Sequence, residues 1–173
     1  GISLMHYISP DVPGHLRGDS SRLKQILFNL VGNALKYSKE GTIQMEVHTQ
    51  QPAEGNFQRL LFTIKDTGIG IPDNLQDHIF EMFTQVDSSF TRQFQGAGLG
   101  LPIVRSIIRM MGGNASVDSE EGRGTTFYVS LPFEIVDTSI EEKPHAPMDQ
   151  RQQFDGHVLL AEDDKVSIKF VQG

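Results

Sequence analysis

Three polar side chains that could share one ligand lie within a short stretch of the sequence. Asn29 and Asn33 are four residues apart and Lys36 follows three later, so a helix would carry all three on one side. Amide oxygens suit a Mg²⁺ ion that keeps several waters, and a lysine beside them can neutralise phosphate oxygens. The spacing is therefore compatible with a Mg-phosphate site. An ordinary amphipathic helix with polar edge residues would show the same pattern.

A carboxylate at the end of an expected strand adds a second recognition group. The apolar run from Leu60 to Lys65 predicts a buried strand, and Asp66-Thr67-Gly68-Ile69-Gly70 follows directly. Glycines let the backbone approach a flat ligand closely, and an aspartate can accept a hydrogen bond from an exocyclic amine. Adenine carries such an amine where guanine has a carbonyl, which a carboxylate would repel. Asp-x-Gly-x-Gly alone is also frequent in ordinary turns.

A glycine-rich loop ahead of a helix offers a third group. Gly96-Ala97-Gly98-Leu99-Gly100-Leu101 leads into an apolar-periodic run with Pro102 in its first turn, and this run ends at Gly112-Gly113. Unpaired N–H groups and the helix dipole at such an N-terminus favour phosphate. The residues before Gly96 are polar loop rather than strand, so a dinucleotide-binding motif is not indicated, and no Walker lysine follows.

The elements that must position these groups are predicted by periodicity. Apolar residues recur at helical spacing from Leu23 to Leu35, which predicts a helix over Ser20–Tyr37. The other expected helices are Asp73–Phe83 and Leu99–Met111. The expected strands are Ile2–Ile8, Thr42–Thr49, Leu60–Lys65, Asn114–Asp118 and Thr125–Leu131. Their number and order predict a two-layer α/β sandwich, with one mixed five-stranded sheet packed against three helices.

Taken in order, these motifs resemble those of a known family. The chain resembles the ATP-binding catalytic domain of sensor histidine kinases, in the superfamily shared with gyrase, Hsp90 and MutL, whose fold is the Bergerat fold. Its N, G1, F and G2 boxes are matched in order by Asn29–Ser38, Asp66–Gly70, Phe80–Phe83 and Gly96–Leu101. The segment Gly124-Thr125-Thr126-Phe127 is similar to the strand that closes the family's nucleotide pocket. The resemblance covers roughly Val12 to Pro132.

The resemblance implies roles for individual residues, with ATP and Mg²⁺ as cofactors. Asn33 would be the principal Mg²⁺ ligand, assisted by Asn29, and Lys36 would contact phosphate, so Asn33 and Lys36 are the expected catalytic residues. Tyr37 would stack near the adenine and Asp66 would hold its amine. The loop over residues 84–98 would be an ATP lid. The other residues expected at the nucleotide are Gly68, Gly70, Ile71, Phe83, Arg92, Gly96, Gly98, Leu99, Gly100, Leu101 and Thr126.

Position 29 bears on the class of reaction. ATP-hydrolysing relatives in the superfamily carry a glutamate four residues before the metal-binding asparagine, where it serves as general base for water. This chain has Asn29 there, whose amide is not a useful base. We therefore expect phosphoryl transfer to a histidine, resting on positioning and charge neutralisation. The alternatives are a module that binds ATP without transferring phosphate, and an ATPase of the superfamily.

Composition is compatible with one domain followed by a tail. The net charge of −7 argues against nucleic-acid binding, and the absence of cysteine fits a cytosolic setting. We expect the catalytic domain over residues 1–133, a flexible linker over 134–156 and the start of a receiver domain over 157–173. In that last segment an apolar run precedes Glu162-Asp163-Asp164, which an acidic turn after a short strand would also explain.

Partners follow from the same resemblance. The histidine acceptor is expected on a dimerisation hairpin upstream in the parent chain, because the histidines of this chain suit surface or packing roles. A receiver domain or response regulator would take the phosphoryl group next. We expect a homodimeric parent and a cytoplasmic location for this domain, which lacks a membrane-length apolar run and a signal peptide and is interpreted as a soluble fragment.

Overall fold

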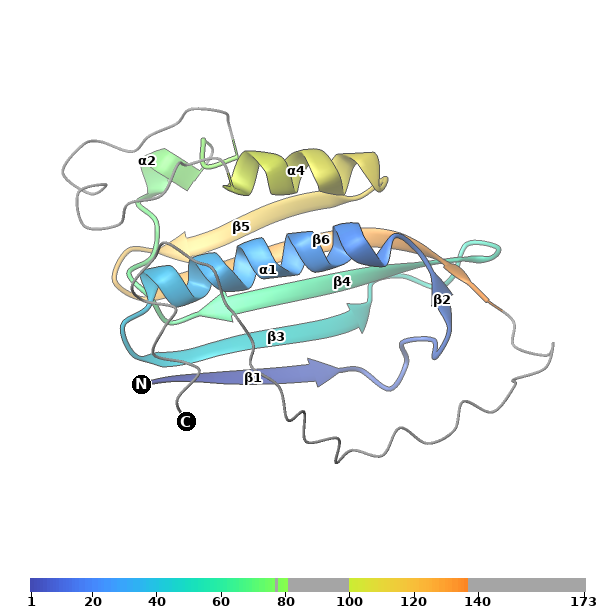
Figure 1. The fold of residues 1–173 in the computed structure, drawn as a ribbon, viewed down its shortest axis with the longest axis horizontal. Helices are drawn as coiled ribbons and strands as arrows, with labels where there is room; N and C mark the ends of the chain where they lie inside the picture. The colour runs from blue at the N-terminus through green and yellow to red at the C-terminus, as the bar shows by residue number, and fades with distance from the viewer. Residues whose placement is uncertain (77, 81–99, 137–173) are drawn as a thin grey trace, which may run out of the picture. The chain divides into compact units, whose positions relative to one another are not determined.

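The scaffold of the molecule is a single mixed sheet. The computed structural model describes residues 1–76, 78–80 and 100–136, all of which lie in the compact unit Gly1–Ser139 (Figure 1). The strands are β1 (Ile2–Ile8), β2 (Leu16–Arg17), β3 (Gly41–Thr49), β4 (Phe57–Asp66), β5 (Asn114–Glu120) and β6 (Gly124–Ile135). They pair in the order β1-β3-β4-β6-β2, and β5 also pairs with β6. The β1–β3 pair is parallel and the other pairs are antiparallel.

The helices of the described residues are α1 (Ser20–Tyr37), α2 (Asp73–Gln76) and α4 (Gly100–Met110). Helix α1 begins after Asp19, whose carboxylate accepts a hydrogen bond from the Arg22 N–H at 3.0 Å and so caps the first turn. It ends at Ser38, whose extended backbone cannot continue the helix and whose N–H still bonds to the Ala34 carbonyl at 3.1 Å. These caps fix where the polar residues of α1 lie along the sheet.

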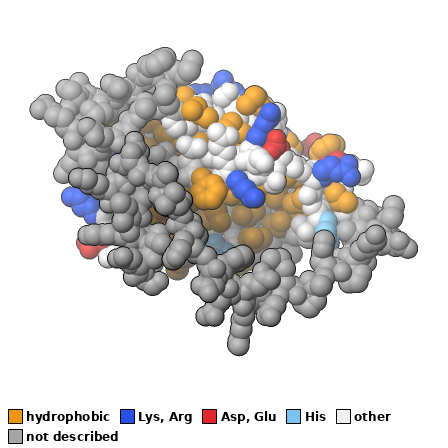
Figure 2. All heavy atoms as spheres, viewed as in Figure 1, with side chains coloured by type: hydrophobic (Ala, Val, Ile, Leu, Met, Phe, Trp, Pro, Cys, Tyr) orange, Lys and Arg blue, Asp and Glu red, His pale blue; other side chains and the backbone are white. Residues whose placement is uncertain are grey.

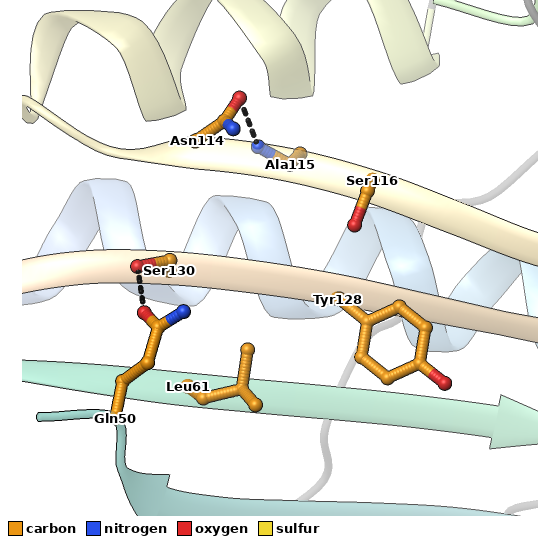
Figure 3. A pocket seen from close by; sticks show the side chains of 7 residues that line it. All are labelled: Gln50, Leu61, Asn114, Ala115, Ser116, Tyr128 and Ser130. Atoms are coloured by element: carbon orange, nitrogen blue, oxygen red, sulfur yellow. Dashed lines mark hydrogen bonds between the residues drawn. The ribbon is translucent and has the colours of Figure 1, made fainter.

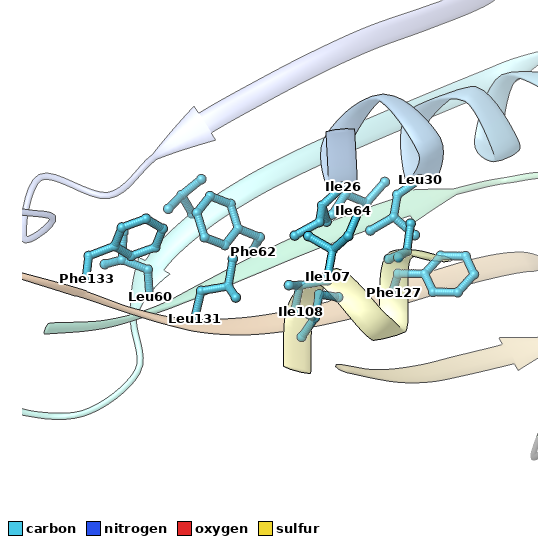
Figure 4. Close-up of a cluster of buried hydrophobic side chains, with 13 residues drawn as sticks. Ile26, Leu30, Leu60, Phe62, Ile64, Ile107, Ile108, Phe127, Leu131 and Phe133 are labelled. Carbon is cyan, nitrogen blue, oxygen red and sulfur yellow. The ribbon is translucent and has the colours of Figure 1, made fainter. Parts of the chain in front are cut away.

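The core lies between one face of the sheet and the two long helices (Figure 4). Side chains alternate along a strand, so β4 buries every second residue and turns the others to the opposite face. Ile26 and Leu30 of α1 and Ile108 of α4 are fully buried, and complete burial of such a side chain contributes roughly 1.5–3 kcal/mol. The sheet residues buried with them are Val47, Leu60, Phe62, Ile64, Phe127, Val129, Leu131 and Phe133.

Helix α1 exposes apolar side chains to solvent on the side away from the core. In the described residues, α1 leaves Phe28 76% exposed and Leu35 42% exposed on its outer side. Figure 2 shows apolar side chains at the surface in the view that places α1 in front of the sheet. No helix of the described residues is long and apolar enough to span a membrane.

The predicted two-layer α/β architecture with a mixed sheet is confirmed, and α1 has the predicted bounds. The sheet has a sixth strand, because the two-residue β2 is too short to give an alternating pattern. Helix α2 is shorter than predicted in the described residues: it spans Asp73–Gln76, and the turn at residues 78–80 follows. The predictions for residues 137–173, which include most of the linker and the receiver start, lie outside the described residues.

Candidate functional site

The end of β4 places a buried carboxylate at the centre of the candidate site. Asp66 is only 6% exposed, and its Oδ1 accepts hydrogen bonds from the Gly68 N–H at 2.8 Å and the Thr125 N–H at 3.3 Å. Burial raises the pKa of Asp66 above its ordinary value of 3.8, and the two N–H groups oppose that rise. Both bonds reach Oδ1, so within the described residues Oδ2 keeps its lone pairs for a ligand.

The glycines around Asp66 are required by the protein's own packing. A Cβ on Gly68 would lie 2.5 Å from the Tyr37 carbonyl oxygen and 2.8 Å from Asp66 Oδ1. At Gly70 the backbone has φ +69°, and a Cβ there would lie 2.1 Å from the Glu120 carbonyl oxygen. At Gly124 φ is +121°, and a Cβ would lie 2.1 Å from the Asp66 carbonyl oxygen. We therefore attribute the glycines first to close backbone contacts among α1, β4, β5 and β6.

Polar residues of α1 lie beside its apolar stripe, and one of them, Asn29, faces the start of α4. Asn29, Asn33 and Lys36 are all half-buried beside the apolar stripe, as their spacing predicts. The Asn29 side-chain amide donates to the Gln25 carbonyl at 2.8 Å, and within the described residues no hydrogen bond to its oxygen is seen. A Cβ on Gly100, the first residue of α4, would lie 3.2 Å from that oxygen. The amide oxygen is thus brought next to a helix N-terminus, where unpaired N–H groups favour anions.

Tyr37 closes α1 at the border of this site. Its ring is partly exposed, the Lys36 ammonium lies 5.5 Å from the ring centroid, and burial raises the pKa of the phenol above 10.0. The Tyr37 carbonyl accepts from the Ile69 N–H at 3.1 Å, and the Ile69 carbonyl accepts from the Gly122 N–H at 2.7 Å. This chain of bonds ties the last turn of α1 to the loop after β4 and to the β5–β6 turn.

The first residues of β6 lie beside Asp66, and Thr126 among them was predicted to contact the nucleotide. Thr126 pairs with Lys65 across the sheet, and Lys65 is exposed on the face opposite the core. Antiparallel partners share a face, so Thr126 lies on that outer face. Thr125 is buried, and its N–H bonds to Asp66. Thr125 is therefore the threonine that contacts Asp66, whereas the contact of Thr126 with a nucleotide stays a prediction.

Ser119 was not predicted to have a role, although it connects three parts of the site. Its hydroxyl accepts from the Ile71 N–H at 2.8 Å, donates to the Gly124 carbonyl at 2.8 Å and lies 3.0 Å from the Thr125 hydroxyl. Alternation along β5 places Ser119 on the same covered side as Ala115 and Val117. A polar residue in this apolar series was the sequence feature that could have identified it.

The described part of the F box is anchored on the core. Phe80 makes an edge-on contact with Phe127, with ring centroids 6.1 Å apart, and the Arg105 guanidinium lies 5.6 Å above its ring. Two of the other predicted nucleotide contacts, Ile71 and Leu101, are half-buried and pack against the core. The remaining predicted nucleotide contacts, Phe83, Arg92, Gly96, Gly98 and Leu99, lie outside the described residues.

A hollow elsewhere on the sheet does not include any predicted site residue. Gln50, Leu61, Asn114, Ala115, Ser116, Tyr128 and Ser130 line a cavity of about 290 Å³ (Figure 3). Leu61, Tyr128 and Ser130 alternate with core residues of β4 and β6, so the hollow lies on the face opposite the helices. Its lining has no charged side chain, and the Ser130 hydroxyl donates to the Gln50 side chain. It is therefore a poor site for phosphate.

Comparison with known proteins agrees with this geometry. Residues 18–135 match the model of the family described as histidine kinase-, DNA gyrase B- and HSP90-like ATPase. The autoinducer 2 sensor kinase/phosphatase LuxQ of Vibrio vulnificus is 40% identical over 95% of this chain and 19% of its own length. The histidine-protein kinase BarA of Escherichia coli is 39% identical over 83% of this chain and 16% of its own length.

A solved structure shows the same fold. The crystal structure of full-length ShkA in complex with AMPPNP has a TM-score of 0.65 and 34% identity, covering 79% of this chain and 26% of that one. The chain spans about a fifth of the length of the curated relatives it matches. With the family model matched over most of the chain and the buried aspartate, polar helix flank and glycines in place, the chain belongs to the histidine kinase-, DNA gyrase B- and HSP90-like ATPase family, as the ATP-binding catalytic domain found in sensor histidine kinases.

Proposed function

We propose that this domain binds Mg-ATP and donates the γ-phosphate to a histidine on a separate dimerisation domain, as one step of two-component signalling. The observation that carries the proposal is the Asp66 carboxylate, buried and held at Oδ1 by two N–H groups while Oδ2 is left for a ligand. A fixed acceptor of this kind selects a base with an exocyclic amine. Adenine has that amine, and the AMPPNP complex of the related ShkA supports the same ligand class.

We propose that α1 and the start of α4 bind the metal ion and the phosphates of ATP, and we call this part the phosphate side of the site. Asn33 and Asn29 would hold Mg²⁺, which when bound neutralises phosphate charge. Neutral amide oxygens beside a helix N-terminus fit an ion that is shared with phosphate oxygens, and the hydrogen bond from Asn29 to Gln25 fixes which end of the amide faces Gly100. Lys36 would add a positive charge to the phosphates. Tyr37 would cover the base at the end of α1.

Transfer to a histidine, rather than to water, is supported by position 29. An amide cannot accept a proton from an attacking water, so the residue one helical turn before Asn33 provides no general base. The relatives named as kinases support the same reaction, and the proposed acceptor is a histidine on a dimerisation domain of the parent protein. A receiver domain or response regulator would follow as the next partner, with the parent a homodimer and this domain in the cytoplasm.

A phosphotransfer assay tests this function. The full 173-residue chain is mixed with Mg-ATP labelled on the γ-phosphate and with the purified histidine hairpin of a matched relative, and acid-labile phosphohistidine is measured. We expect label on the hairpin and little release of phosphate when the hairpin is omitted. Sustained phosphate release without the hairpin would instead show an ATPase. Nucleotide binding without label on a hairpin that its own kinase phosphorylates would show a binding module.

A further inference from the structure

A buried hydroxyl beside Asp66 has no hydrogen-bond partner. Among the described residues, Ser38 Oγ is the buried side-chain atom for which no partner exists, and the residue is 6% exposed. Buried polar atoms in folded proteins nearly always have a partner, so an exception calls for a physical reason. The helix cap does not supply that reason, because the backbone N–H of Ser38, and not its hydroxyl, closes α1 on the Ala34 carbonyl.

The position of the hydroxyl indicates its acceptor. A Cβ on Gly68 would lie 2.8 Å from Ser38 Oγ, 2.8 Å from Asp66 Oδ1 and 2.5 Å from the Tyr37 carbonyl oxygen. These three oxygens therefore surround the space that the missing side chain of Gly68 leaves. The Tyr37 carbonyl accepts from the Ile69 N–H, and Asp66 Oδ1 accepts from two N–H groups. Within the described residues Asp66 Oδ2 accepts no hydrogen bond, and an ionised carboxylate forms a stronger bond than a carbonyl, so we take the carboxylate as the acceptor.

We propose that Ser38 is a positioning residue for recognition of the base, its hydroxyl donating to the Asp66 carboxylate when an amine-bearing purine is bound. This inference rests on the proposed contact between Asp66 and adenine. A bound base covers the carboxylate and removes it from water, which increases the value of each additional donor. Two backbone N–H groups hold the carboxylate already, and the Ser38 hydroxyl would add a third donor.

The proposal separates two roles that a serine at the end of a helix could have. If Ser38 only stabilised the fold, its truncation would weaken the binding of all nucleotides alike or lower the melting temperature of the free domain. If it positions Asp66, truncation changes the recognition of the amine specifically. Replacing an unpaired buried hydroxyl by hydrogen removes no existing bond, so the free domain should keep its stability.

Calorimetry on the full chain tests the inference with Ser38→Ala and a control, Ser116→Ala, an exposed serine on the outer side of β5. Each protein is titrated with ADP and with the ADP analogue that lacks the exocyclic amine, and its melting temperature is measured without nucleotide. We expect Ser38→Ala to weaken the binding of ADP about three- to tenfold, the net effect of one lost hydrogen bond, while the analogue is bound as before. The control should change neither affinity.

Two results would overturn the inference. An unchanged ratio of the two affinities in Ser38→Ala would show that the hydroxyl does not act on the amine contact. A lower melting temperature with that same unchanged ratio would assign Ser38 a structural role. If the wild-type chain binds ADP and discriminates against the analogue while Ser38→Ala behaves identically, only this inference fails. If the wild-type chain does not bind ADP, the proposed function fails with it.

Discussion

The two sides of the candidate site are constructed differently. The base side is dominated by Asp66, which is buried, held by two backbone donors and surrounded by glycines whose replacement would cause overlap with backbone atoms. The proposed phosphate side is a flank of half-buried polar residues on α1, of which Asn29 faces the start of α4. In the proposed function, base recognition would therefore use groups that are part of the fold itself, whereas the metal and phosphate contacts would use half-buried side chains on α1. Mutations on the two sides should separate stability from affinity.

The largest effect is expected from Gly124→Ala on the base side. The new methyl group would overlap the Asp66 carbonyl oxygen at 2.1 Å, and φ is +121° there, so we expect a loss of about 3 kcal/mol or more in the free energy of unfolding. Urea unfolding measures it. Gly122→Ala is the matched control, because φ is +80° but nothing lies within 4 Å of the new methyl group. It should cost only about 1 kcal/mol. Equal losses in the free energy of unfolding of the two variants would show that the backbone shifts to relieve the overlap at Gly124.

On the phosphate side, Asn33→Ala should reduce affinity without reducing stability. Asn33 is half-buried and is proposed to hold Mg²⁺, so we expect ATP to bind at least about tenfold more weakly with Mg²⁺ present and nearly as before in its absence. Paired titrations with Mg²⁺ and with a chelator measure the difference. Lys24→Ala, an exposed α1 residue, is the control. A similar loss in the presence of chelator would remove Asn33 from the metal site.

The pH dependence of nucleotide binding probes the base side without mutation. Burial raises the pKa of Asp66 above 3.8, and the ionised carboxylate accepts from the adenine amine more strongly than the protonated acid does. Affinity for ADP should therefore fall as the pH falls through this raised pKa. The stability of the free domain should respond with the opposite sign: the contribution of this group is fully present below 3.8 and is lost as the pH rises through the folded-state pKa.

Titration calorimetry at a series of pH values measures the first of these effects, and urea unfolding at the same values measures the second. The ADP analogue without the exocyclic amine is the control, since its phosphates titrate as those of ADP do while it makes no contact with the carboxylate. If ADP and the analogue lose affinity in parallel on acidification, Asp66 is not the acceptor.

The smallest effect is expected at Gly32, between the two asparagines on α1. A Cβ there meets nothing within 4 Å, and the residue is exposed, so Gly32→Ala should stabilise the domain by about 0.5–1 kcal/mol. Because Gly32 contacts neither side of the site, nucleotide affinity should not change. Thermal unfolding and calorimetry check both statements. A weakened affinity would show that nucleotide binding depends on the backbone flexibility of α1 at Gly32, and would contradict the statement that Gly32 is not part of the site.

The sequence predicted the elements with strong local signals. Helix α1 was found with its bounds because Asp19 caps it and apolar residues recur at helical spacing from Leu23 onward. Strand β2 was missed because a two-residue strand is defined by its partner, β6, and not by its own pattern. The ordered motifs likewise predicted the family.

Contacts between distant segments were harder to predict. The bond from the Thr125 N–H to Asp66 was not predicted, since the phase of alternation in β6 depends on its pairing with β4. Ser119 and Ser38 entered the site only through the packing of β5 and α1 around the loop after β4. The glycines of that loop were expected to admit a ligand, whereas the structure shows the backbone atoms they must accommodate.

The central claim is that Asp66 selects adenine through its carboxylate, and Asp66→Asn tests it most directly. The amide replaces one oxygen with a donor that repels the adenine amine but has almost the same shape. Titration calorimetry with ADP should show a loss of affinity of about a hundredfold. The variant loses a hydrogen bond to a charged carboxylate, and its amide N–H group then faces the N–H group of the adenine amine. Asp118→Asn, an exposed β5 carboxylate, should bind ADP as the wild type does. Unchanged affinity in a folded Asp66→Asn domain would contradict the claim.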